Sequence, residues 1–94
     1  VGSAPAFPHG VIDTIPELAA VAKKHGLWLH VDACVGGFLA PFARRLGYPI
    51  PPFDFEVDGV RSMSADLHKF GWAPPGISTF SLRDGAHQRL QRVL

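Results

Sequence analysis

The stretch IPELAAVAKKHGLWLHVD, residues 15–32, decides the fold. Its first part places apolar residues on one helical face, with a proline in the first turn and basic residues just before a glycine. This pattern predicts a helix over 15–25. The apolar run over 27–31 follows at once, and such a run directly after a helix is typical of a buried strand in a parallel sheet. The residues therefore predict an α/β fold in which Asp32 falls at the carboxyl end of a strand.

Outside this stretch the chain predicts short elements separated by turns. Prolines and glycines over residues 2–10 predict a loop, and Asp13 or Thr14 is suited to cap the helix that follows. The remaining expected elements are a short helix over 38–46, strands over 59–65 and 77–82, and a helix from residue 86 onward. This order predicts a mostly parallel sheet flanked by helices.

The composition narrows the possible classes of protein. The 94 residues suffice for one small domain, yet 47% of them are hydrophobic and the mean hydropathy is +0.14. A formal charge of +1 argues against nucleic acid as a partner, and a single cysteine excludes a disulfide framework within the chain. No apolar run approaches the roughly 20 residues of a membrane span. Because the chain is apolar and turn-rich and begins without methionine, we expect an internal piece of a larger protein. Without a signal peptide or a span in this stretch, we expect a cytoplasmic location, while an anchor upstream of it stays open.

Polar residues follow two of the predicted strands, where ligands bind in open α/β sheets. Lys69 lies between His68 and the bulky sequence FGW. These neighbours predict a desolvated amine with a lowered pKa, which is the group that forms a Schiff base with an aldehyde. The alternative is a surface lysine whose stem lies along aromatic side chains.

Asp32 is the second candidate. In pyridoxal phosphate enzymes an acid keeps the ring nitrogen protonated, so that the ring can accept electrons. The alternative is an aspartate that caps the next segment.

Three further residues have both a chemical and a structural interpretation. His68 either donates to a phosphate oxygen or is satisfied by the backbone, and Cys34 either packs on a cofactor ring or is a small buried thiol. His9 faces either the site or solvent. His30 lies inside a strand, and we interpret it as structural. The histidines lack the spacing of metal ligands, so no metal site is expected.

Three strings carry a resemblance to a known family. GSAPAFPHGVID, LHVDACVGGF and FDFEVDGVRSMSADLHKFGWAPPG follow in order and cover the chain from Gly2 to about Leu82. They are similar to the central part of group II pyridoxal-phosphate-dependent decarboxylases, which are of fold type I, the aspartate aminotransferase-like class. The resemblance implies that residues 1–94 are a central fragment of the large cofactor domain, without its N-terminal part or the C-terminal small domain.

The resemblance also implies roles for single residues. Lys69 resembles the lysine that binds the cofactor covalently, and Asp32 resembles the acid that pairs with the pyridinium nitrogen. Cys34 matches a small residue that packs against the ring. His68 matches a histidine that contacts the phosphate or lies beside the lysine. Ser3 and His9 match a loop near the cofactor.

The same resemblance implies a function. The GSAPAFPHG and FDFEVDGV strings favour the branch that cleaves a phosphorylated sphingoid base to a fatty aldehyde and phosphoethanolamine, acting as a homodimer. Two residues depart from that branch: Leu67 stands where threonine is usual, and Pro75 where a second lysine is usual. An amino-acid decarboxylase with the same cofactor is the alternative, and an inactive truncated remnant is the second. We expect the 94 residues alone to bind pyridoxal phosphate weakly or not at all.

Overall fold

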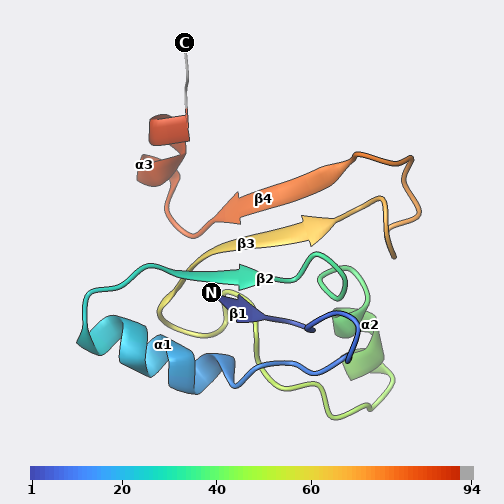
Figure 1. The fold of residues 1–94 in the computed structure, drawn as a ribbon, viewed down its shortest axis with the longest axis horizontal. Coiled ribbons are helices and arrows are strands. Elements are labelled where there is room, and N and C mark those ends of the chain that lie inside the picture. The colour runs from blue at the N-terminus through green and yellow to red at the C-terminus, as the bar shows by residue number, and fades with distance from the viewer. Residues whose placement is uncertain (92–94) are drawn as a thin grey trace.

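The computed structural model describes residues 1–91 and contains one four-stranded sheet with the strand order β1-β2-β3-β4. The strands are β1 (Gly2–Ser3), β2 (Leu29–Asp32), β3 (Val60–Asp66) and β4 (Ser78–Leu82). The first three are parallel and β4 is antiparallel to β3. The arrowheads of β1, β2 and β3 point to the same edge of the sheet (Figure 1). The predicted mostly parallel α/β sheet is thus confirmed.

The helices are short and occupy the predicted segments. They are α1 (Ile15–Lys24), α2 (Ala40–Arg45) and α3 (Gly85–Gln88), and a 3-10 turn over Arg89–Gln91 follows α3. The helix expected from residue 86 onward is thus α-helical only at its start, and its last three residues lie outside the described part of the chain.

The start of the chain differs from its prediction, because the expected loop contains strand β1. The Ala4 amide donates to the Asp32 carbonyl at 2.8 Å, which extends the pairing of β1 with β2. Asp13 Oδ2 accepts a hydrogen bond from the Ser3 amide at 2.8 Å. The predicted side-chain cap of α1 is therefore wrong, because Asp13 binds β1 and Thr14 makes no capping hydrogen bond.

Strand β2 begins two residues later than predicted. The Leu27 amide donates to the Ala22 carbonyl at 2.8 Å, so Leu27 caps the end of α1 and is not yet part of the strand. The Leu27 side chain is 60% exposed, whereas Leu29 and Val31 are buried. Pairing with β3 therefore starts only at Leu29.

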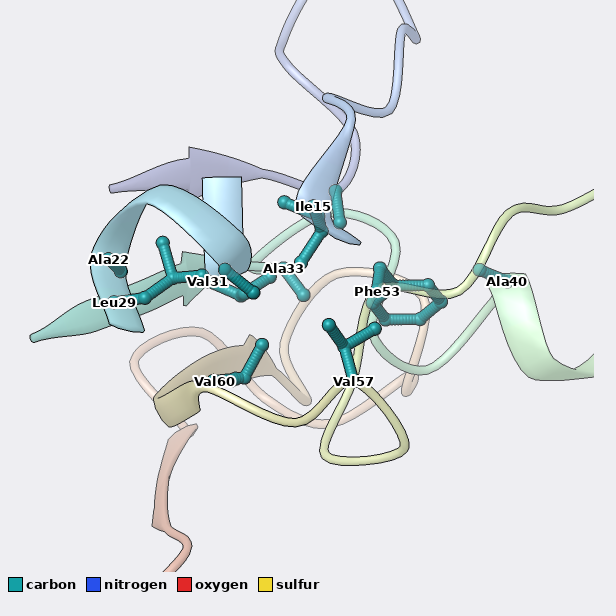
Figure 2. Packing of buried hydrophobic residues seen from close by; sticks show 11 residues of the cluster. Ile15, Ala22, Leu29, Val31, Ala33, Ala40, Phe53, Val57 and Val60 are labelled. Atoms are coloured by element: carbon teal, nitrogen blue, oxygen red, sulfur yellow. The ribbon is translucent and has the colours of Figure 1, made fainter. Parts of the chain in front are cut away.

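The core lies between α1, the sheet and the loop over 46–59. Figure 2 shows Ala22 of α1 near Leu29 of β2, and Phe53 of the loop near Val57, all in one cluster of buried residues. Alternation along β2 directs Leu29 and Val31 to this core, so His30 and Asp32 face the other side of the sheet. The helix α1 thus covers the apolar face of β2, and the polar side chains of β2 lie on the opposite face of the sheet.

Candidate active site

The candidate site lies at the carboxyl edge of β2 and β3. Asp32 is the last residue of β2 and Asp66 the last residue of β3. The loops that follow are joined, since the Asp66 amide donates to the Cys34 carbonyl at 3.2 Å. The Lys69 amide donates to the Asp66 carbonyl at 3.4 Å, which turns the chain back over the strand end. The structure thus brings together the two polar segments that the sequence placed after separate strands.

Two adjacent glycines allow the loop after β2 to pack tightly. A Cβ atom on Gly36 would lie 2.6 Å from the Ala4 carbonyl oxygen, and one on Gly37 would lie 2.6 Å from the Ala65 Cβ. Any larger residue at these positions would push the loop away from β1 and β3. The glycines therefore keep Cys34 close to the strand ends.

The Asp32 carboxylate is half-buried and oriented by its neighbours. Its Oδ1 accepts the Cys34 amide at 3.1 Å and the Ser64 hydroxyl at 3.5 Å. Hydrogen bonding by the Cys34 side chain lowers the pKa of Asp32, against the opposing effect of burial. The group is therefore ionised at neutral pH, as a partner for a protonated ring nitrogen must be.

The Lys69 amine is paired with a carboxylate. Its Nζ lies 2.8 Å from Asp66 Oδ2, and the side chain is 35% exposed. Hydrogen bonds to Asp66 and then to Cys34 raise the pKa of Lys69, and burial opposes them only in part. The expectation of a lowered pKa is therefore wrong, because the aromatic neighbours do not bury the amine and Asp66 stabilises its charged form.

An apolar hollow of about 640 Å³ opens beside Lys69. It is lined by Phe7, Cys34, Val35, Lys69, Phe70 and Trp72. The lysine, the cysteine and the FGW string were expected near the site from the sequence, whereas Phe7 and Val35 were not. The loop that contains Phe7 approaches the hollow only because β1 pairs with β2, and no local pattern indicates that pairing.

The remaining predicted site residues, Ser3, His68 and His9, do not line this hollow. Ser3 is paired with Asp32 in the sheet register, so it is adjacent to the candidate acid. His68 Nδ1 donates to the Ile77 carbonyl at 2.9 Å, which is the backbone-satisfied alternative, and its Nε2 lies 3.8 Å from Asp66 Oδ2. His9 is exposed in a turn and does not line the hollow.

The described residues contain neither a metal-ligand cluster nor a helix that could span a membrane. Over residues 1–91, no set of three or more His, Cys, Asp or Glu side chains is grouped so as to hold a metal ion. None of the helices described in the same range has the length and apolarity needed to cross a membrane.

The pairing of Lys69 with Asp66 makes a testable prediction about amine reactivity. Asp66→Asn removes the carboxylate that stabilises the charged amine, so we expect it to lower the pKa of Lys69. Because only the uncharged amine is acylated, the midpoint of acylation then moves to lower pH. Competitive labelling of the cofactor-free protein with acetic anhydride, followed by peptide mass spectrometry, measures this midpoint. The matched control is Asp58→Asn, which removes an exposed ion pair with Lys23 and leaves the Lys69 midpoint unchanged. An unchanged midpoint in Asp66→Asn would contradict the assignment.

The residues present fit a pyridoxal phosphate group. An aromatic aldehyde with a ring nitrogen needs an amine, an anionic partner for that nitrogen and apolar surface for the ring. Lys69 supplies the amine, ionised Asp32 the anionic partner, and the hollow the apolar surface. The Cys34 side chain interacts with both charged groups, Asp32 and Lys69.

Comparison with known proteins identifies the family. The sequence profile of the pyridoxal-dependent decarboxylase conserved domain matches residues 7–93. A sphingosine-1-phosphate lyase of Arabidopsis thaliana is 61% identical over 99% of this chain. A probable L-aspartate decarboxylase of Pyrococcus furiosus is 51% identical over 79% of the chain, which covers 20% of that protein. The solved sphingosine-1-phosphate lyase of Burkholderia pseudomallei matches 96% of the chain and 21% of its own length, with 50% identity and a TM-score of 0.92.

The chain spans 17% of the length of the Arabidopsis lyase. The match to the Burkholderia structure confirms the expected fold type, and the matched profile confirms at the level of the family that the cofactor is pyridoxal phosphate. The chain belongs to the pyridoxal-dependent decarboxylase family.

Proposed function

We propose that the complete protein is a pyridoxal-phosphate-dependent carbon–carbon lyase. Its substrate would be a phosphorylated sphingoid base and its products a fatty aldehyde and phosphoethanolamine. The observation that carries the proposal is that the Lys69 amine lines the apolar hollow, while the ionised Asp32 carboxylate binds the amide of Cys34, another residue of the same lining. The 61% identity to a sphingosine-1-phosphate lyase supports the choice of reaction within the family.

Each residue has a defined part in this proposal. The bound cofactor would supply an electron sink for the bond that breaks. Lys69 would provide the amine that attaches the cofactor and later moves protons at its Nζ. Asp32 would hold a proton on the ring nitrogen, and Cys34 would pack on the ring. Asp66 pairs with the protonated amine and raises its pKa, so this ion pair would have to open before the amine could attach the cofactor.

Two residues outside the hollow bear on how the protein would bind the phosphate of the substrate. Pro75 is exposed and uncharged at the position where the resemblance implies a second lysine. A substrate phosphate would therefore need a cation from elsewhere in the protein. His68, which already donates to Ile77, is available to a phosphate only through its other nitrogen.

The architecture of the whole protein belongs to the same proposal. We infer that residues 1–94 are a central part of a larger cofactor domain that acts as a homodimer. Exposed apolar side chains such as Phe42 on α2 and Leu46 directly after it support this inference, because other parts of the protein would cover them. The cytoplasmic location expected from the sequence stays a prediction.

A decarboxylase acting on an amino acid is the second candidate. The 51% identity to a probable L-aspartate decarboxylase favours it, since the same lysine and acid would serve loss of carbon dioxide. Proline in place of the second lysine at position 75 also favours the decarboxylase, because a positive charge that could bind a substrate phosphate is absent there.

One experiment separates these candidates and the inactive remnant. The complete reading frame is expressed, loaded with pyridoxal phosphate and offered dihydrosphingosine phosphate and a panel of amino acids. We expect a long-chain aldehyde and phosphoethanolamine in equal amounts. Release of carbon dioxide without aldehyde would establish the decarboxylase instead. An absence of turnover with every substrate would favour the remnant.

A further inference from the structure

A line of hydrogen-bonded side chains leads to Asp32 on the sheet face that points away from α1. The Trp28 indole nitrogen lies 2.8 Å from Ser62 Oγ, which lies 2.8 Å from His30 Nδ1. His30 Nε2 lies 3.3 Å from Ser64 Oγ, and Ser64 Oγ lies 3.5 Å from Asp32 Oδ1. The line therefore begins at a group that only donates and ends at a group that only accepts.

The chemistry of the two ends fixes the direction of every contact between them. Ser64 has one hydroxyl proton, which it donates to the Asp32 carboxylate, so His30 Nε2 must carry the proton shared with Ser64. Burial lowers the pKa of His30, so the ring is neutral and Nδ1 carries no proton. Nδ1 then accepts from Ser62, whose oxygen accepts from Trp28. All four contacts point toward Asp32.

Packing holds this line in place. The Phe80 ring of β4 stacks on the His30 ring with centroids 5.6 Å apart and an interplanar angle of 19°. Ser62 is only 1% exposed, so its hydroxyl has no access to competing water. At the far end, the Trp28 ring meets His87 edge-on with centroids 5.0 Å apart. The His30 ring is thus fixed in its rotation by packing and in its tautomer by its hydrogen bonds.

We propose that His30, acting through Ser64, is the positioning residue for the Asp32 carboxylate. Ser64 and the Cys34 amide bind the same oxygen, Oδ1, and together they set the rotation of the carboxylate at the end of β2. A serine hydroxyl alone can turn to other acceptors, whereas one that accepts the His30 Nε2 proton directs its own proton at Asp32. The proposal rests on the proposed function, in which Asp32 faces the ring nitrogen. It also revises the sequence-based interpretation of His30 as merely structural.

The tautomer of His30 tests the direction of the line without any turnover. The complete protein is labelled with ¹⁵N-histidine and examined by long-range ¹H–¹⁵N correlation spectra, first without and then with pyridoxal phosphate. His30→Gln assigns the signal. We expect a neutral His30 with its proton on Nε2 in both states. A proton on Nδ1, or on both nitrogens, would overturn the proposal.

Two variants test the effect on Asp32. His30→Phe keeps a ring against Phe80 but removes the donor to Ser64, and His30→Gln retains an amide donor. We expect His30→Phe to lower kcat about 10-fold or more and to leave KM and the amount of bound cofactor unchanged. Removal of a residue that orients a metal ligand has an effect of this size in metalloenzymes. His30→Gln is expected to recover most of the loss. The control is His25→Phe, at the exposed end of α1, which should behave as the unmutated protein.

The outcomes separate this inference from the proposed function. A normal kcat in His30→Phe, with cofactor still bound through Lys69, would overturn the inference and leave the function standing. Equal losses in His30→Phe and His30→Gln would indicate a steric role and would also overturn it. If the unmutated complete protein binds no pyridoxal phosphate, the proposed function fails and the inference fails with it.

Discussion

Lys69→Ala is expected to abolish covalent attachment of pyridoxal phosphate to the complete protein. The visible absorption band of the attached cofactor disappears because no other described amine lines the apolar hollow among residues 1–91. Turnover falls by about 10²–10⁴-fold, the range for removal of a positioned proton-transferring group. Absorption spectra and product assays at saturating cofactor measure both effects.

The matched control for this prediction is Lys24→Ala. Lys24 is exposed in the last turn of α1, and its removal should change neither the band nor the turnover. A Lys69→Ala protein that keeps its band and its turnover would contradict the assignment of the candidate site. Adding a small free amine such as ethylamine should restore part of the turnover in Lys69→Ala, because the amine replaces the missing proton acceptor.

Asp32→Asn is expected to leave the cofactor attached and to slow the reaction. The amide is close in size to the carboxylate but carries no charge, so it cannot hold a proton on the ring nitrogen. Loss of one preorganised electrostatic partner lowers kcat by about 10²–10³-fold. The assay is single-turnover kinetics, with the cofactor content of each preparation determined from its absorption spectrum.

The control for Asp32→Asn is Asp58→Asn, which removes an exposed carboxylate that pairs with Lys23. We expect no change in kcat for this variant. If Asp32→Asn also retains full kcat, Asp32 does not serve the ring nitrogen, and the positioning role of His30 has no target.

The fold could be predicted where local patterns decide it. The apolar face of α1, its terminal glycine and the following apolar run were sufficient to predict the helix, strand β2 and a mostly parallel sheet. Strand β1 could not be predicted, because two residues carry no periodicity and form a strand only by pairing with β2. The start of β2 was misplaced for a related reason: Leu27 is apolar, yet its amide closes α1.

In the candidate site, too, the features set by local sequence could be predicted, and those set by contacts between distant segments could not. Strand ends indicated where Asp32 and Lys69 would lie, since parallel strands end at one edge of a sheet. The raised pKa of Lys69 was missed, because it depends on the turn that brings Nζ within 2.8 Å of Asp66. The link from His30 to Asp32 was missed because it runs through Ser64 on another strand, and only the sheet register determines that this serine lies beside Asp32.

The most direct test of the central claim locates the cofactor on the chain. The complete protein is loaded with pyridoxal phosphate, reduced with borohydride, digested and mapped by peptide mass spectrometry. We predict that the added pyridoxyl phosphate mass lies on Lys69. The same mass on Lys23, Lys24 or a lysine outside this stretch, with Lys69 unmodified, would contradict the account.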